Sequence, residues 1–214
     1  MRGLQVSGDV SILEAKSEAK FAALDLQDAK VAGNVYANGL TVAGTLHMEG
    51  IQIGNSLGMR EAQLGEVWLN GAKITRGLAM DDVVIKSTLT INSIQIDGIL
   101  GMRGAKLTKV DLRGARIGHE LQLQKATITG TLDMNTTKAD ASVHMEGAEL
   151  TRADLTGTQI RDQLILDEAT IADTLIMNDI KIDGSVLMTK ARFHHVNIGA
   201  AKITGSINID GTHR

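Results

Sequence analysis

The hydrophobic positions of the chain repeat every eleven residues from residue 24 to near its end. Each repeat reads Leu-x-Met-x-x-Ala-x-Ile-x-x-x, with other aliphatic residues at these positions in some copies. Within a repeat the apolar residues lie two positions apart, which favours strands over the competing eleven-residue helical repeat. The repeats begin at Leu24, Val35, Leu46, Leu57, Val67, Leu78, Leu89, Leu100, Val110, Leu121, Leu132, Val143, Ala153, Leu164, Leu175, Val186, Val196 and Ile207.

The spacing of these repeats predicts how the strands close a core. Successive repeats start 11, 11, 11 and then 10 residues apart, so four of them form a 43-residue block. Each repeat supplies two very short strands, and four strands can enclose a core where two cannot, so one coil takes 21 or 22 residues. About nine coils at the ~4.8 Å strand spacing predict a rod on the order of 43 Å long. The expected fold is all-β: a single-stranded β-helix of square cross-section.

The composition fits a narrow prism of this kind. The 214 residues include no Pro, no Cys and only four aromatic residues. Pro has no place where nearly every backbone N–H pairs with the next coil. The lack of Cys excludes disulfides, a thiolate nucleophile and Cys-ligated zinc. The net charge of −3 indicates no general attraction to nucleic acid or anionic lipid.

Two segments carry a resemblance to a known family. Residues 110–114 (VDLRG) and 153–157 (ADLTG) match the A-(D/N)-L-x-x pentapeptide repeat. The chain therefore resembles pentapeptide-repeat proteins, which implies a right-handed quadrilateral β-helix, although its steps alternate between five and six residues. Residues 31–35 and 42–46 give a looser resemblance to the bactofilins, which have shorter coils and form filaments by end-to-end stacking.

The two ends of the chain depart from the regular repeat. Val10 begins a unit, but the next secure start is Leu24, fourteen residues later. Residues 11–14 read as a capping box followed by helix formers, which predicts a short helix or loop over residues 15–23. We therefore expect an N-terminal cap over residues 1–23 and a solenoid over 24–214. Ile207 begins a unit close to the last residue, so we expect an uncapped last coil that pairs with another molecule, or a chain cut from a longer one.

One outward column of the predicted solenoid is basic. The residue between the Ala and Ile positions of alternate repeats is Lys, Arg or Gln in all nine coils and never acidic. Such a ladder could bind a linear anion such as a nucleic-acid backbone or an acidic glycan. The alternative is a set of long solvated side chains that cover the prism. The candidate binding ladder is Lys30, Lys73, Arg116, Lys138, Lys181 and Lys202.

A second outward column is small or apolar and is a candidate association strip. A flat strip of Gly, Ala, Ile and Leu allows another surface to approach closely, although it could equally be ordinary solvent-exposed sheet. Its larger members are Tyr36, Ala79, Ile165 and Leu187.

The sequence predicts no catalytic, cofactor-binding or metal-binding residues. His194 and His195 are adjacent in the sequence and could bind a metal weakly, but exposed turn histidines are the simpler interpretation. The carboxylates of Asp111, Asp133 and Asp154 stack in one column, as in β-helices that cleave polysaccharides. Those sites need long loops, whereas the turns predicted here have two or three residues.

These patterns favour a non-enzymatic β-solenoid that acts as a rigid protein-interaction or scaffold module. We expect it to bind a protein partner or itself, end to end or side by side, in the bacterial cytoplasm, without a cofactor or a membrane span. One alternative is a polysaccharide-active or anionic-polymer-binding β-helix that uses the Asp column or the basic ladder. Another is a gyrase-binding nucleic-acid mimic, which would need a far more acidic surface than a net charge of −3 provides.

Overall fold

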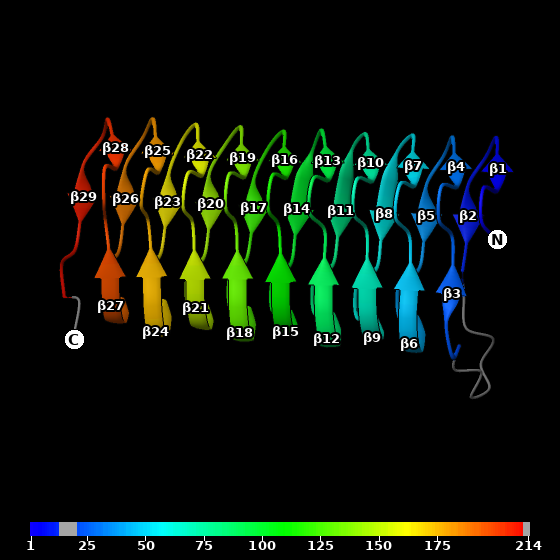
Figure 1. The fold of residues 1–214 in the computed structure, drawn as a ribbon, viewed down its shortest axis with the longest axis horizontal. Coiled ribbons are helices and arrows are strands. Elements are labelled where there is room, and N and C mark those ends of the chain that lie inside the picture. The colour runs from blue at the N-terminus through cyan, green and yellow to red at the C-terminus, as the bar shows by residue number, and fades with distance from the viewer. Residues whose placement is uncertain (13–20, 212–214) are drawn as a thin grey trace.

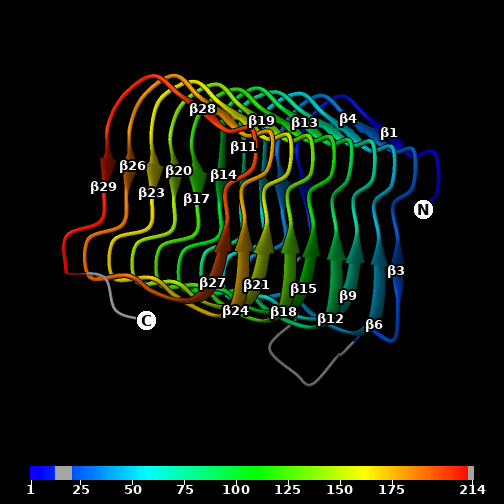
Figure 2. The same ribbon diagram turned by 60° about the vertical axis from the view of Figure 1, so that its left-hand side comes forward.

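The computed structural model of the chain describes residues 1–12 and 21–211. These residues form a rod of stacked coils built from parallel β-strands, with β1 at one end and β29 at the other (Figure 1). The strands stack into three long sheets along the rod, here called A, B and C (Figure 2). The predicted β-solenoid of about nine coils is therefore confirmed.

Sheet A contains the Ala-x-Ile segments of alternate repeats. Its strands, in spatial order, are β1 (Gln5–Val6), β4 (Lys30–Val31), β7 (Gln52–Ile53), β10 (Lys73–Ile74), β13 (Gln95–Ile96), β16 (Arg116–Ile117), β19 (Lys138–Ala139), β22 (Gln159–Ile160), β25 (Lys181–Ile182) and β28 (Lys202–Ile203). Each strand has only two residues, one pointing outward and one into the core.

Sheet B contains the Leu-x-Met segments that follow sheet A in each coil. Its strands, in spatial order, are β2 (Val10–Ser11), β5 (Val35–Tyr36), β8 (Ser56–Gly58), β11 (Gly77–Ala79), β14 (Ile99–Gly101), β17 (Leu121–Gln122), β20 (Val143–His144), β23 (Leu164–Ile165), β26 (Val186–Leu187) and β29 (Ile207–Asn208).

Sheet C merges the two remaining sides of each coil. From the N-terminal end its strands are β3 (Leu24–Asp25), β6 (Thr41–His47), β9 (Gln63–Trp68), β12 (Val84–Thr90), β15 (Lys106–Asp111), β18 (Thr127–Asp133), β21 (Glu149–Asp154), β24 (Thr170–Ile176) and β27 (Arg192–Asn197). From β6 onward each strand holds an Ala-x-Ile segment and the next Leu-x-Met segment, and the pairing shifts register between them, as between Val42 and Thr45. From β6 to β27 the strands alternate between seven and six residues. In each 43-residue block, the repeat that is ten and not eleven residues long is therefore shortened at this bulge, in a six-residue strand of sheet C.

A tight turn links each Met position to the next Ala position. The second turn residue has a positive φ at nine glycines and at ten other residues of the described chain, including Glu61 (58°) and Asp82 (56°). A backbone bond closes the turn, as from Ile51 N to Met48 O at 3.2 Å. The two-residue gaps of the repeat are thus left-handed turns, which Gly adopts without steric cost.

The interior is one continuous apolar column. All eight internal methionines are at most 4% exposed and stack with Leu, Ile, Val and Ala from neighbouring coils. Thr137 and Thr158 occupy the Ala position, and each hydroxyl donates to a carbonyl of the preceding coil, Leu112 O at 2.8 Å and Met134 O at 2.7 Å respectively. The two threonine hydroxyls in the core are therefore satisfied by hydrogen bonds to the preceding coil.

Sheets A and B begin before residue 24. Gln5 pairs with Lys30 and Val10 pairs with Val35, so β1 and β2 continue sheets A and B within the segment that the repeat analysis assigned to a cap. The short helix or loop expected over residues 15–23 lies largely outside the described residues. Its last residues are not helical, because Phe21 forms a β-bridge with Val42.

Candidate interaction surfaces

The basic ladder runs the length of sheet A. The register pairs Lys30 with Gln52, Gln52 with Lys73, and so on through Lys202, and Gln5 extends the column by one strand. The six cations Lys30, Lys73, Arg116, Lys138, Lys181 and Lys202 are exposed. None of them forms an ion pair with another described residue. Strand stacking thus holds six unpaired positive charges about 5 to 10 Å apart on one face.

Acidic residues reach only the border of this face. Asp97, Asp140 and Asp183 follow the strands of sheet A two positions after the ladder residue. Asp140 pairs with Arg161 at 3.4 Å, in an exposed contact. The ladder therefore keeps its positive charge along the centre of the sheet.

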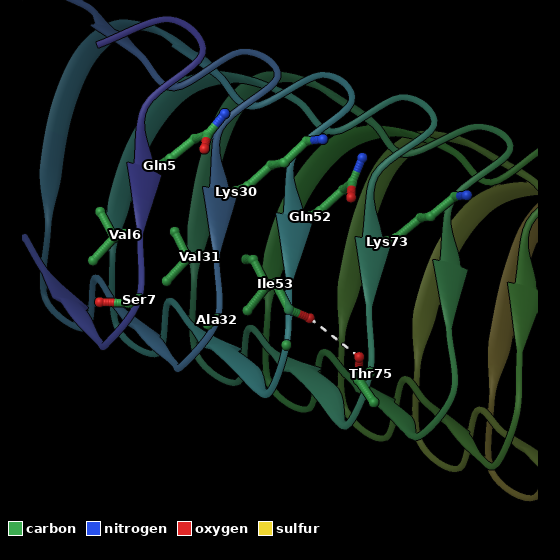
Figure 3. Close-up of a pocket in the computed structure, with 11 residues that line it drawn as sticks. Gln5, Val6, Ser7, Lys30, Val31, Ala32, Gln52, Ile53, Lys73 and Thr75 are labelled. Carbon is green, nitrogen blue, oxygen red and sulfur yellow. Dashed lines mark hydrogen bonds between the residues drawn. The ribbon is translucent and has the colours of Figure 1, made fainter.

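A shallow, open hollow of about 710 Å³ lies over the first four strands of sheet A. The side chains of Gln5, Lys30, Gln52 and Lys73 form one row along it (Figure 3). Small residues line it as well, namely Ser7, Ala32, Gly54 and Thr75. The hollow follows the ladder across several coils, a shape that suits an extended ligand better than a compact one.

The predicted association strip is a continuous column on sheet B. Tyr36 lies on β5, Ala79 on β11, Ile165 on β23 and Leu187 on β26. Tyr36 is 42% exposed, whereas the other three are half-buried. From β5 to β29 the column reads Tyr36, Gly58, Ala79, Gly101, Gln122, His144, Ile165, Leu187 and Asn208, and Ser11 on β2 extends it by one strand.

The N-terminal half of this strip is hollowed into a groove of about 340 Å³. Its floor is formed by Gly58, Ala79 and Gly101, which have little or no side chain. Tyr36 closes one end and Gln122 the other. The groove thus results from the small residues of three consecutive strands.

An ion triad of Arg60, Asp81 and Arg103 borders this groove. None of the three was predicted from the sequence as a site residue. Asp81 accepts from Arg60 Nε at 3.1 Å and from Arg103 Nε at 3.2 Å. Burial raises the pKa of Asp81, but hydrogen bonds from Arg103 and Arg60 outweigh it and hold the pKa below its usual value. A third cation, Arg76, lines the groove without an ion pair among the described residues. The charged groups lining the groove therefore carry a net charge of about +2.

The C-terminal half of sheet B has the opposite character. His144 contacts Glu146 through Nδ1 at 3.0 Å and Glu120 through Nε2 at 3.9 Å. Asp162 accepts from Ser142 Oγ at 2.8 Å, and Asp167 accepts from the backbone N–H of Thr189. Three carboxylates, those of Glu146, Asp162 and Asp167, thus border the part of the strip that carries Ile165 and Leu187, while Glu120 precedes β17 at the boundary between the two halves.

The Asp column on sheet C has a structural role. Asp111, Asp133 and Asp154 each accept a hydrogen bond from the backbone N–H two residues later, within the following turn. Arg113 lies between Asp111 Oδ2 at 2.7 Å and Asp133 Oδ2 at 3.6 Å. Burial raises the pKa of Asp111, and hydrogen bonds from Arg113 lower it further than burial raises it. These contacts explain the Asp of the pentapeptide-like motif by turn formation.

The histidines within residues 1–12 and 21–211 do not gather into a metal site. Across residues 1–12 and 21–211, no three His, Cys, Asp or Glu side chains are grouped so that they could hold a metal ion. His194 and His195 lie on the exposed strand β27 and not in a turn, so that prediction was wrong. Their ring centroids are 4.3 Å apart in an edge-to-face arrangement. His47 packs against Trp68 in the same way at 4.9 Å.

The last coil exposes residues that are buried elsewhere. Val196, Ile198, Ile207 and Ile209 occupy the Leu and Met positions, yet they are 39–58% exposed. The strands β27, β28 and β29 are the terminal members of sheets C, A and B. The described chain thus ends in an apolar surface with open strand edges.

No helix of the described chain is long and apolar enough to cross a membrane. No protein-family model and no curated protein matches the chain. The resemblance to pentapeptide-repeat proteins and bactofilins therefore remains a prediction, while the β-solenoid fold stands on the structure.

Proposed function

We propose that the protein is a non-enzymatic interaction module, a rigid scaffold that associates through the end of its solenoid. The supporting observation is the exposure of inward-facing residues in the last coil. Val196 and Ile198 are 39% and 46% exposed, whereas Leu175 and Met177, one coil earlier at the same positions, are fully buried. Uncovered apolar groups beside unpaired strand edges favour pairing with another chain.

A second copy fits this surface by continuing the ladders. The opposite end of the rod presents β1, β2 and β3, the other terminal strands of sheets A, B and C. Head-to-tail stacking would place β28 against β1, β29 against β2 and β27 against β3 of the next copy. This contact is heterologous, so it would generate open chains whose length grows with concentration.

The test is sedimentation velocity over a range of protein concentrations. We expect the sedimentation coefficient of the parent protein to increase with its concentration. The double variant Val196→Lys/Ile198→Lys should lose this increase. Asn197→Lys is the matched control, because Asn197 lies between them and belongs to the outward column of β27. A parent that stays monomeric, or a control that dissociates as readily as the double variant, would refute end-to-end association.

A second candidate function is favoured by the unpaired cations of sheet A, namely the binding of a linear anionic polymer. The six basic residues share one face, and the hollow beside Lys30 and Lys73 follows the same direction. Contacts with successive anionic groups would be additive and sensitive to salt.

The test uses retention on a dextran sulfate resin. Lys73→Glu/Arg116→Glu/Lys138→Glu should elute at much lower salt than the parent. The control is Lys86→Glu/Lys106→Glu/Lys109→Glu, which makes the same change in net charge on sheet C. Equal loss of retention in both triple variants would show that net charge, and not the ladder, governs binding.

A further inference from the structure

The outer face of sheet B is divided into two halves that complement each other in charge. The groove in the N-terminal half is lined by Arg60, Arg76 and Arg103 and a single carboxylate, Asp81. The C-terminal half is bordered by the carboxylates of Glu146, Asp162 and Asp167, and His144 contacts Glu146 there. Turn residues of opposite sign, such as Glu61 and Asp82, lie one position further out and do not line the groove.

The same two halves also complement each other in shape. The N-terminal half has Gly58, Ala79 and Gly101 in the central column, which leaves the groove of about 340 Å³. The C-terminal half has Ile165 and Leu187 in that column, both half-buried. One half is therefore a trough and the other an apolar ridge, on the same sheet and in the same register.

We propose that two copies of the chain pack sheet B against sheet B with their rods antiparallel. A twofold axis that runs along the strands, midway between β17 and β20, sets Gly101 opposite Ile165 and Ala79 opposite Leu187 of the second copy. Each ridge then fills the other copy's groove. The interface is isologous and closes at a dimer, unlike head-to-tail stacking.

The same axis pairs the charges. It reverses the order of the coils but keeps the direction of the strands, so a column on one copy faces the same column on the other. Arg103 then faces Asp167, and Arg60 faces Asp210, at the position that follows the Met slot. With the rods parallel, the twofold axis would run along the rod and set each coil against its own copy, so that groove would face groove and the ridge of Ile165 and Leu187 would face itself, which disfavours this arrangement.

The contact area indicates a weak dimer. The overlap from β8 to β29 covers seven strand spacings, about 34 Å, and a width of about five residues, about 16 Å. This gives on the order of 550 Å² for each copy, below the ~800 Å² for each partner of a standard interface. We therefore expect dissociation in the micromolar range or above and a strong dependence on salt.

The absence of Cys allows a direct test by disulfide trapping. In Ala79→Cys/Leu187→Cys the two thiols lie five strands apart within one chain, about 24 Å, too far for an intramolecular bond. We expect a covalent dimer on mild oxidation, detected by non-reducing electrophoresis. Ala79→Cys alone should not cross-link, because antiparallel packing separates the two copies of this residue.

Gln63→Cys/Thr170→Cys is the matched control, with the same separation of five strands on sheet C. Cross-linking of this control to the same extent, efficient cross-linking of Ala79→Cys alone, or no covalent dimer of the double variant would each overturn the proposal. None of these variants touches the last coil or the basic ladder, so the proposed functions are tested separately.

A charge swap gives an independent measurement of the register. Arg103→Glu and Asp167→Arg should each raise the dissociation constant by about tenfold in sedimentation equilibrium, and the double variant should recover most of the loss. The recovery separates an intermolecular role from the contact of Arg103 with Asp81 within one copy. Double variants that dissociate as readily as the single ones would exclude this register.

Discussion

Replacing Gly98 by Ala tests how closely the coils of the solenoid are stacked. Gly98 lies at the corner between sheets A and B, near the middle of the rod. A Cβ atom added there would lie 1.3 Å from the carbonyl oxygen and 2.5 Å from the carbonyl carbon of Arg76 in the preceding coil. Both atoms belong to the backbone, so no side-chain rotation relieves the clash.

The size of the effect follows from this geometry. Contacts of a Cβ below 3.0 Å are essentially never seen, so the two coils must separate locally by about 1.7 Å. A separation of that size breaks the neighbouring bond from Asp97 N to Ile74 O, now 3.0 Å, and loosens the packing beside it. Two or three lost hydrogen bonds at about 1 kcal/mol each predict a destabilisation of about 3 kcal/mol.

Gly71→Ala is the matched control. Gly71 has a φ of 65°, and a Cβ there would meet nothing within 4 Å, so the substitution introduces only backbone strain of about 1 to 2 kcal/mol. Both changes add one methyl group and restrict the unfolded chain equally, so their difference reports on the folded state.

The assay is urea unfolding followed by circular dichroism, with hydrogen exchange as a local measurement. Because coils contact only their neighbours, a weakened central contact should broaden or split the transition, as well as lower its midpoint. Faster exchange should be confined to the coils around Arg76 and Gly98. If Gly98→Ala unfolds with the same midpoint and breadth as Gly71→Ala, the coils are not packed as closely as the structure indicates.

Two further predictions concern the core and the ion triad. Met102 is fully buried, so Met102→Ala should cost about 2 to 5 kcal/mol in urea unfolding and Met102→Leu less than about 1.5 kcal/mol; equal losses would contradict close packing of the column. The pKa of Asp81 is lowered in the folded state, so its contribution to stability is present above the unfolded pKa of about 4 and is lost as the pH falls through the lower folded pKa. The stability difference between the parent and Asp81→Asn should therefore shrink as the pH is lowered from 5 to 2, and a constant difference would contradict this contribution.

The repeat alone predicted most of the fold, because strand period and burial coincide in this chain. Leu46 and Met48 are two residues apart and both point inward, as do their equivalents in every interior coil. The merging of two sides into sheet C could not be predicted in this way. Residues 43–45 (Ala-Gly-Thr) carry no large apolar side chain that would show whether they face the core. Whether they form a turn that ends the strand or a bulge within it depends on their backbone hydrogen bonds with the next coil.

The candidate surfaces were predicted only where the two-residue period holds. Lys73 and Ala79 alternate with buried residues inside strands, so their columns could be derived from the sequence. Arg60, Asp81 and Arg103 lie at the first turn residue, after the strand has ended, where alternation no longer fixes the direction of a side chain. Their spacing of 21 and 22 residues was a usable signal, because one coil has that length.

Sheets A and B differ in what kind of partner they can fix in place. On sheet A the same type of charge recurs in most coils, so a ligand displaced by a coil or two meets nearly the same surface. On sheet B the trough over Ala79 and the ridge at Leu187 occur once each, so displacement by one coil loses both the fit and the pairing of Arg103 with Asp167. A repetitive core thus supports one face suited to binding in many registers and another suited to binding in one, and only the second can define a dimer of fixed geometry.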